Sequence, residues 1–471
     1  MQSTRNERDL LGEKPVPAEA YYGIQTARAL ENFRITGQRI HPALVTGLAQ
    51  VKKAAALANH QLGYLEPHIA TAIVRAADEV IEGRLRDQFL VDPIQGGAGT
   101  SANMNANEVI ANRAIELLGG VKGDYARVSP NDHVNFAQST NDVFPTAIRL
   151  AVMAGASDLL ENLARLEDAL RFKALEFDDV VKMGRTHLQD AVPIRLGQEF
   201  RAYATAVNRG RIRLQQAVEA LEEVNMGATA VGTGLNADPE YPPLVIALLS
   251  QISGRRLRPP VDLVDATQSC DGFVAVSGAL KALAVALGKI ANDIRLMASG
   301  PRAGLKEINL PEMQPGSSIM PGKVNPVMAE VLNQTCFFVM GNDLTVTLAA
   351  EAGQLELNVM EPVMAHALLT SLDALSAATG LFTERLVRGI TANRERCEQM
   401  VSQSVGLVTA LNPVIGYKNA SAVAREATLT GRPVREIVLE KGLLSAEELD
   451  RLLSPRALTQ MGIARRELPQ V

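Results

Sequence analysis

Four polar loops interrupt the mostly helical pattern of this chain, and they carry the side chains that could do chemistry. They occupy residues 95–105, 138–142, 184–190 and 316–326. Together they offer hydroxyls and amides with one histidine, one arginine and one lysine, but no cluster of carboxylates or histidines at metal-ligand spacing. This inventory suits a small, oxygen-rich anionic substrate held by hydrogen bonds, and it predicts no metal site.

Two nucleotide-binding interpretations of these loops are excluded. The glycines at 96–99 are not part of a GxGxxG motif with a following acidic residue. The loop from Gly316 to Lys323 superficially resembles a P-loop, but five residues separate its glycines in place of four, and Val324 replaces the Ser or Thr that binds magnesium. A lone histidine is usually structural, yet only His187 among the six histidines lies between a hydroxyl and an amide in a glycine-led loop.

The segment 316–326, GSSIMPGKVNP, resembles the active-site signature of the aspartase/fumarase superfamily. Segments 184–191 (GRTHLQDA) and 232–236 (GTGLN) narrow the resemblance to the fumarase and aspartase branch. Further features look like aspartases and unlike fumarases: 22–26 (YGIQT), 95–100 (QGGAGT), 139–141 (STN), 351–362 (EAGQLELNVMEP), and Ser129 where many fumarases carry a histidine. The resemblance covers nearly the whole chain, from Asp9 to Pro455.

The resemblance implies anti elimination across the C2–C3 bond of a four-carbon diacid. It favours reversible deamination of L-aspartate to fumarate and ammonia through an aci-carboxylate intermediate, with class II fumarate hydratase chemistry on malate as the alternative. A third interpretation is a catalytically silent structural relative, like the lens crystallins of this superfamily. It is disfavoured because Ser317, Lys323, Asn325 and His187 are all present. The scheme requires no cofactor.

The catalytic base implied by the resemblance is Ser317, acting as an alkoxide on a flexible loop. An unperturbed serine is far too weak an acid, so the backbone amides of residues 316–322 and the charge of Lys323 would have to stabilise the oxyanion. The β-carboxylate gains negative charge during proton removal and needs hydrogen-bond donors. The expected donors are Thr100, Ser139, Thr140 and Ser318.

The other expected substrate contacts fall into two groups. They are the α-carboxylate partners Lys323, Asn325 and Thr186, and the amino-group partners Asn141 and His187, with Thr100 as a further candidate. Glu330 matches a family carboxylate that pairs with the histidine, which could fix the tautomer and charge of the imidazole.

Composition excludes several classes of partner. Hydrophobic residues make up 47% of the 471 residues, charged residues make up 21%, and the net charge is −5, so no nucleic-acid partner is expected. The N-terminus lacks an apolar signal segment, and four charged side chains interrupt the longest apolar stretch, 273–298. We therefore expect a cytoplasmic protein without a membrane span. Cys270, Cys336 and Cys397 form no CxxC pair, which predicts isolated reduced thiols.

The elements that must position these loops are expected to be helices. Apolar spacings of three and four over 200–224, together with long helical patterns at 151–178 and 273–299, indicate a bundle of long helices. Shorter helices are expected at 42–61 and 66–81. The segment 273–299 has little polar surface on any side, so we expect neighbouring subunits to cover it.

The chain is thus expected to contain three all-α domains. They are a mixed helical domain at 1–140, a central long-helix bundle at 141–394, and a small helical domain at 395–471, where Ser445–Glu448 (SAEE) predicts a capping box. The resemblance implies the same fold, assembled as a homotetramer whose central helices form one multi-helix core. It also implies active sites that combine loops from three chains.

Overall fold

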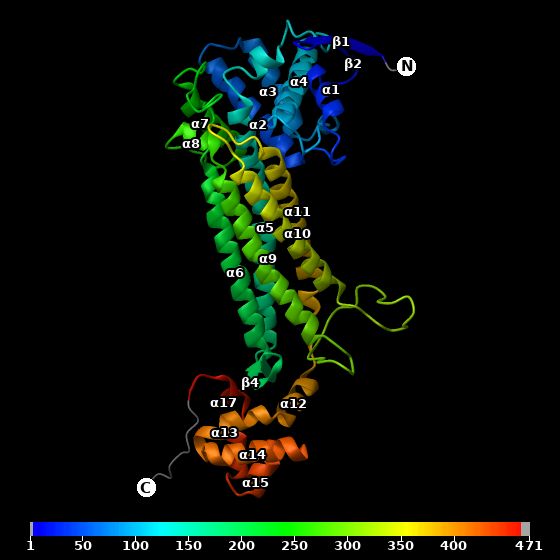
Figure 1. Ribbon diagram of the computed structural model, residues 1–471, viewed down its shortest axis with the longest axis vertical. Coiled ribbons are helices and arrows are strands. Elements are labelled where there is room, and N and C mark those ends of the chain that lie inside the picture. The colour runs from blue at the N-terminus through cyan, green and yellow to red at the C-terminus, as the bar shows by residue number, and fades with distance from the viewer. Residues whose placement is uncertain (1–2, 463–471) are drawn as a thin grey trace. The chain divides into compact units, whose positions relative to one another are not determined.

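The computed structural model describes residues 3–462 (Figure 1). These residues divide into two compact units. Of the described residues, unit 1 contains 3–161, 211–284 and 336–376. Unit 2 contains 162–210, 285–335 and 377–462. The cuts between these stretches fall inside five long helices, so each of these helices contributes residues to both units.

The five long helices are α5 (Thr140–Glu176), α6 (Leu196–Glu219), α9 (Asp271–Met297), α10 (Val327–Glu351) and α11 (Glu361–Arg385). α5 contains Pro145, which has no N–H group to donate to the Asn141 carbonyl one turn earlier. The side-chain amide of Asn225 donates to that carbonyl at 3.0 Å instead. This substitution satisfies the carbonyl, so α5 can begin before the proline.

Unit 1 contains one strand pair and six of the shorter α-helices. Its remaining elements are β1 (Thr4–Asp9), β2 (Gly12–Pro17), α1 (Ile24–Asn32), α2 (Pro42–Gln61), α3 (Pro67–Ile81), α4 (Thr100–Leu117), the π-helical turn η2 (Pro130–Val134), α7 (Tyr241–Ser253) and α8 (Leu263–Gln268). A proline begins both α2 and α3, where its fixed φ suits the first helical turn. α2 packs against α3 and α7, and α3 packs against α4 (Figure 1).

The start of α1 rests on a buried carboxylate of α4. Glu108 is 2% exposed and accepts from the backbone N–H groups of Gly23, Gln25 and Thr26 at 2.8–3.1 Å. Burial raises the pKa of Glu108 to about 6, although these hydrogen bonds oppose the rise. A Cβ on Gly23 would lie 2.9 Å from the Glu108 carboxyl carbon, so this approach needs glycine. The Glu108 carboxylate therefore caps α1 at the YGIQT segment.

Unit 2 contains two strand pairs and the C-terminal helices. Its remaining elements are β3 (Val181–Thr186), β4 (Gln189–Arg195), β5 (Ile308–Asn309), β6 (Thr391–Ala392), α12 (Arg394–Gln403), α13 (Val408–Ile415), α14 (Tyr417–Thr430), α15 (Val434–Glu440), α16 (Ala446–Leu452) and α17 (Pro455–Thr459). The C-terminal helices enclose an apolar core that includes Leu411, Val423, Ile437 and Leu449. The predicted capping box opens α16.

Two helices, α5 and α9, are long and apolar enough to cross a membrane by length and composition alone. Each helix has one most apolar window of 18 residues. In α5, 72% of that window is buried inside the protein, and in α9 the share is 56%. Core helices of water-soluble proteins pass the same test, so these two helices are weak support for a membrane location.

The all-α fold expected from the sequence is confirmed. α2 spans the predicted residues 42–61, α3 begins one residue later than 66, and α9 lies two residues earlier than 273–299. The start of α5 was missed by eleven residues, because the polar residues 139–142 and Pro145 mask a helix that begins at residue 140. The three-domain division and the homotetramer stay predictions.

Candidate active site

The first part of the predicted site lies at the N-termini of two helices in unit 1. Thr100 is the first residue of α4, Thr140 is the first residue of α5, and Ser139 and Asn141 flank Thr140. The first backbone N–H groups of a helix lack helical partners and carry partial positive charge, so both N-termini favour an anion. The predicted carboxylate-binding hydroxyls therefore lie where the backbone already favours negative charge.

The loop before Thr100 has an unusual backbone. Gly97, Ala98 and Gly99 have φ angles of 88°, 56° and 89°, in the left-handed region that favours glycine. Gly99 also lies against the ring of Phe144 in α5, where an added Cβ would come within 2.4 Å of a ring carbon. Glycine at position 99 thus allows the N-terminus of α4 to approach α5 closely.

Asp142 fixes the start of α5. Its Oδ1 accepts from the Ser139 N–H at 2.9 Å, and its Oδ2 accepts from two N–H groups in segment 227–229 at 3.2 and 3.1 Å. Asn141 donates its side-chain amide to the Ala230 carbonyl at 2.7 Å. The segment just before the GTGLN motif therefore holds the predicted substrate loop in place.

A buried ammonium group supports the same loop. Lys52 of α2 has no exposed surface and donates to Asn135 Oδ1 at 2.8 Å and to Gln138 Oε1 at 2.9 Å. Burial lowers the pKa of Lys52 to about 7 and raises that of Asp142 to about 7, and each charge opposes the shift of the other. Both groups are buried, so each depends on its hydrogen-bond partners in this loop.

The side chains of this part of the site are already sorted into hydrogen-bond donors and acceptors. Thr100 and Asn141 each donate to a backbone carbonyl, at 2.6 and 2.7 Å, which leaves oxygen lone pairs available on both side chains. Ser139 Oγ accepts from a backbone N–H at 3.2 Å, and Thr140 Oγ1 accepts from Asn103 Nδ2 at 3.2 Å. Their hydroxyl protons remain available. The arrangement therefore offers two acceptors and two donors.

In unit 2, the hairpin β3–β4 carries Thr186 and His187 at its exposed tip. Thr186 pairs with Gln189, so the turn contains only His187 and Leu188. Their φ angles of 55° and 61° are typical of a type I′ turn, which Asn-Gly usually forms. A residue other than glycine costs about 1–2 kcal/mol in this region, so the turn is strained.

Buried ion pairs hold the base of this hairpin. Lys182 Nζ lies 3.0 Å from Glu199 and 2.8 Å from one oxygen of Glu307, and Arg185 Nη1 lies 2.7 Å from the other. Glu307 has no exposed surface. Burial raises the pKa of Glu199, and Lys182 opposes the rise. Because Arg185 immediately precedes Thr186, these contacts fix the strand that leads into the strained turn.

The loop with the predicted base is closed by its own ends. The Gly316 N–H donates to the Lys323 carbonyl, and Asn325 Nδ2 donates to the Gly316 carbonyl, both at 2.8 Å. Inside the loop, Ser317 Oγ accepts from the backbone N–H groups of Ile319 at 3.2 Å and Met320 at 3.0 Å. Two fixed donors on one hydroxyl oxygen stabilise negative charge on that oxygen.

Within residues 3–462, no side-chain hydrogen bond or ion pair is found for the remaining predicted residues of unit 2. Ser318 and Lys323 are exposed on the Ser317 loop, and Glu330 lies in the first turn of α10. Across residues 3–462, no hydrogen bond or ion pair joins Glu330 to His187. The expected pairing of these two residues stays a prediction.

Sequence reasoning missed the residues that support the site. Asn103, Asp142 and Glu307 were not identified, because polar residues next to a motif look like ordinary loop or helix-surface residues. The sequence pattern could have identified Lys52. It lies three or four residues from Leu48, Ala49 and later alanines, which are buried on the same helix. A charged residue on an apolar helix face predicts a buried charge with a specific partner.

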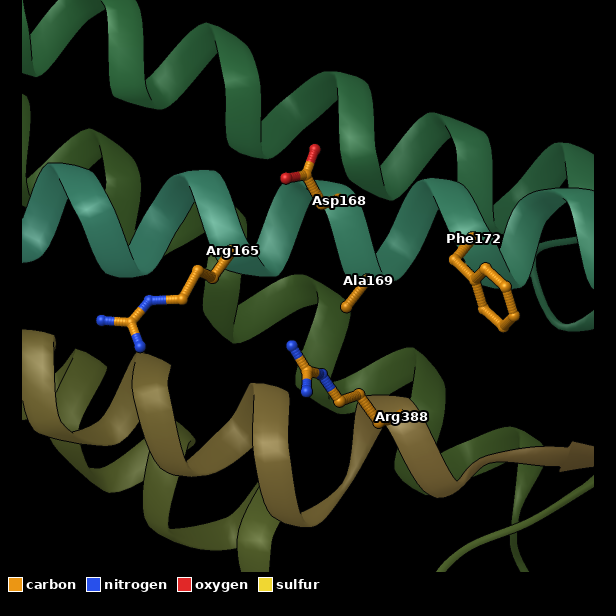
Figure 2. Close-up of a pocket in the computed structure, with 5 residues that line it drawn as sticks. All are labelled: Arg165, Asp168, Ala169, Phe172 and Arg388. Atoms are coloured by element: carbon orange, nitrogen blue, oxygen red, sulfur yellow. The ribbon is translucent and has the colours of Figure 1, made fainter.

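The cavity in Figure 2 is a different place from the predicted site. It has a volume of about 500 Å³ and is lined by Arg165, Asp168, Ala169, Phe172 and Arg388. None of the predicted site residues lines it. Within the described part of the chain, no group of three or more His, Cys, Asp or Glu side chains could hold a metal ion.

Comparisons with known proteins agree with the signature loops. A family model described as Lyase matches residues 12–341, and one described as Fumarase C C-terminus matches residues 407–460. An aspartate ammonia-lyase from a Bacillus species is 57% identical over 98% of this chain and 99% of its own length. This chain belongs to the aspartase/fumarase superfamily. The aspartate ammonia-lyase of Escherichia coli K12, at 53% identity over 96% of each chain, is a further superfamily relative.

Solved structures of superfamily members share the fold. A fumarate lyase:delta crystallin from Brucella melitensis, bound to cobalt, has a TM-score of 0.94 at 52% identity, over 96% of this chain and 99% of that one. A class II fumarase from Schistosoma mansoni has a TM-score of 0.92 at 37% identity, over 96% and 98%. The aspartase/fumarase fold expected from the sequence is therefore confirmed.

The contact between Gly99 and Phe144 can be tested with a matched glycine. Gly99→Ala and Gly97→Ala introduce the same methyl group at nearly the same φ, but the nearest atom to a Cβ at 97 lies 3.7 Å away. Gly97→Ala should cost about 1–2 kcal/mol, and Gly99→Ala a further 1–3 kcal/mol, roughly, from overpacking. Guanidinium unfolding at equal protein concentration measures both. Equal midpoints would contradict the close approach.

The strain in the His187–Leu188 turn can be tested by comparing two replacements of Leu188. Leu188→Ala removes the exposed side chain but keeps the Cβ, whereas Leu188→Gly also removes the backbone strain. The glycine variant should be more stable than the alanine variant by about 1 kcal/mol, after the larger entropy loss of glycine on folding. Denaturation midpoints decide the question, and an alanine variant at least as stable as the glycine variant would show that the turn is unstrained.

Proposed function

We propose that this superfamily member catalyses the reversible deamination of L-aspartate to fumarate and ammonia. The observation that carries the proposal is the pair of backbone N–H groups that donate to Ser317 Oγ, the atom that must act as the base. Relatives named aspartate ammonia-lyase, at 53–57% identity over nearly the whole chain, support L-aspartate as the substrate. Malate has weaker support, because the class II fumarase is 37% identical.

Ser317 removes the C3 proton of the substrate as an alkoxide. The N–H groups of Ile319 and Met320 stabilise the charged oxygen, and they are in place before the reaction, so they cost no reorganisation. Lys323 adds a positive charge to the same loop and holds the α-carboxylate with Asn325. The amino group of the substrate is already protonated and can leave as ammonia, so the scheme needs no strong general acid.

The donor and acceptor side chains of unit 1 match two groups of the substrate, its β-carboxylate and its amino group. Ser139 and Thr140 have protons available and bind the β-carboxylate, where the aci-carboxylate charge accumulates beside the N-terminus of α5. Thr100 and Asn141 have lone pairs available and accept from the ammonium group. Thr100 therefore fits the second of its two expected roles, as an amino-group partner.

The other assignments follow the family pattern and complete the proposal. Ser318 contributes a further donor to the β-carboxylate, Thr186 contacts the α-carboxylate, and His187 contacts the amino group. Glu330 pairs with His187 and sets its charge. The chemistry uses no cofactor, and we expect the protein to act in the cytoplasm.

We further propose a homotetramer in which three subunits contribute to each active site. α10 exposes a row of apolar side chains within unit 1: Phe337 is 62% exposed, Leu344 is 61% exposed and Leu348 is 59% exposed. Their spacings of seven and four residues place them on one helix face, which assembly would bury. His187 at the exposed hairpin tip has no side-chain partner among residues 3–462, and a neighbouring subunit would supply one.

Replacing Ser317 tests the base. Ser317→Ala should lower kcat with L-aspartate at least about 1000-fold, because it removes the group that accepts the proton. Binding of succinate, a four-carbon diacid without an amine, should change little. The ultraviolet absorbance of fumarate measures turnover, with L-malate as the parallel substrate. A variant that keeps a substantial fraction of its activity would assign proton removal to another group.

Mixing two inactive variants tests the shared site. Thr186→Ala and Ser317→Ala should each be nearly inactive as homotetramers, while their dissociated and remixed chains should regain activity. If Thr186 and Ser317 of one site come from different chains, random assortment leaves about one quarter of the sites with both residues intact. Each variant dissociated and reassembled alone is the control. No recovery after verified subunit exchange would refute the shared site.

A further inference from the structure

A threonine hydroxyl can donate or accept a hydrogen bond, so a carboxylate site must fix which of the two it does. Thr140 Oγ1 lies 3.2 Å from the side-chain nitrogen of Asn103 in α4. An amide N–H can only donate, so the Thr140 oxygen accepts from it and its proton is left for another acceptor. The donor character of Thr140 therefore depends on the orientation of the Asn103 amide.

The orientation of the Asn103 amide is fixed by Lys52, which acts on it through Asn135. In its protonated form Lys52 Nζ can only donate, so Asn135 turns its Oδ1 toward it, at 2.8 Å. The Nδ2 of Asn135 donates in turn to the Gln138 carbonyl at 3.2 Å. Asn103 lies on the Oδ1 side and donates to it at 3.2 Å, so its nitrogen must face Asn135. The same nitrogen contacts Thr140.

The reversed arrangement would place two oxygens together. If the Asn103 amide turned over, its Oδ1 would face Asn135 Oδ1 and would accept from Thr140. The Thr140 lone pairs would then meet the substrate carboxylate, which is repulsive. Asn103 is 1% exposed, so bulk water does not relieve such a clash. The charged groups of this cluster are Lys52 on α2 and Asp142 on α5.

We propose that Asn103 is a positioning residue that holds Thr140 as a hydrogen-bond donor to the substrate's β-carboxylate, and that Lys52 sets the direction of Asn103 through Asn135. The inference rests on the proposed function, because it takes the carboxylate contact of Thr140 as given. It extends that function to residues that do not touch the substrate.

A double-mutant cycle between Asn103→Leu and Thr140→Val tests the proposal, with succinate as the ligand and calorimetry as the measurement. Thr140→Val keeps the shape and removes the hydroxyl, and should weaken succinate binding by about 10- to 100-fold. Asn103→Leu alone should weaken it by about 3- to 10-fold, since the hydroxyl loses its fixed direction. In the Thr140→Val background, Asn103→Leu should have almost no further effect.

Asn107 provides a matched control. It is fully buried one turn further along α4 and donates to the same Asn135 oxygen at 3.1 Å, but no hydrogen bond joins it to Thr140 across residues 3–462. Asn107→Leu should therefore disturb the buried amides equally, and its effect on succinate should add to that of Thr140→Val. If Asn103→Leu does not fold, Asn103→Ala provides the same cycle.

We call the series of contacts from Lys52 through Asn135 and Asn103 to Thr140 the relay. The outcomes test the relay separately from the proposed function. Additive effects of the 103 and 140 substitutions, or unchanged succinate binding in the 103 variant, would overturn the relay. A 107 variant that is coupled to Thr140 as strongly as the 103 variant would also overturn it. Turnover of L-aspartate by the unmodified protein is measured separately. If succinate binds but L-aspartate is not deaminated, the proposed function fails and the cycle still decides the relay.

Discussion

A lysine ammonium group without exposed surface constrains the N-terminal part of the candidate site. An ammonium group can only donate hydrogen bonds and cannot be left unpaired in a protein interior, so the atoms around Lys52 must be oxygens or opposite charges. Asn135 and Gln138 meet the first demand and Asp142 meets the second. Because Gln138 and Asp142 bracket the predicted substrate loop, the requirements of one buried charge also determine the conformation of that loop.

The two units hold their site residues in different ways. In unit 1, buried amides and carboxylates fix the helix N-termini. The backbone N–H groups and the nearby hydroxyls can therefore both donate hydrogen bonds to a carboxylate. In unit 2, ion pairs on Glu307 fix the strand that leads into a strained turn, and Ser317 sits in a loop closed by Gly316, Lys323 and Asn325. In the first arrangement the supporting side chains of Lys52, Asn103 and Asp142 are buried, whereas in the second Thr186, His187 and Lys323 are exposed.

The sequence predicted the helices well, and it predicted poorly the contacts that support the candidate site residues. Apolar periodicity locates α2 and α9 within two residues, because burial on one helix face leaves a regular pattern. The start of α5 has no such pattern, since Asn225 replaces the hydrogen bond lost at Pro145 from 80 residues away. The signature loops identify Ser317 and Thr140, but the hydrogen-bond direction at Thr140 depends on Lys52 and Asn135, which no local motif connects.

The direction of the Thr140 hydroxyl has a consequence for protein engineering. If Thr140 binds the β-carboxylate as proposed, a substrate with a cationic group in place of that carboxylate would need an acceptor where Thr140 now offers its proton. Changing Thr140 alone would leave the Asn103 N–H in place, and turning the Asn103 amide is prevented by Asn135 and the ammonium group behind it. A library restricted to residues that contact the ligand would therefore miss the required solution, which includes a buried position on α2.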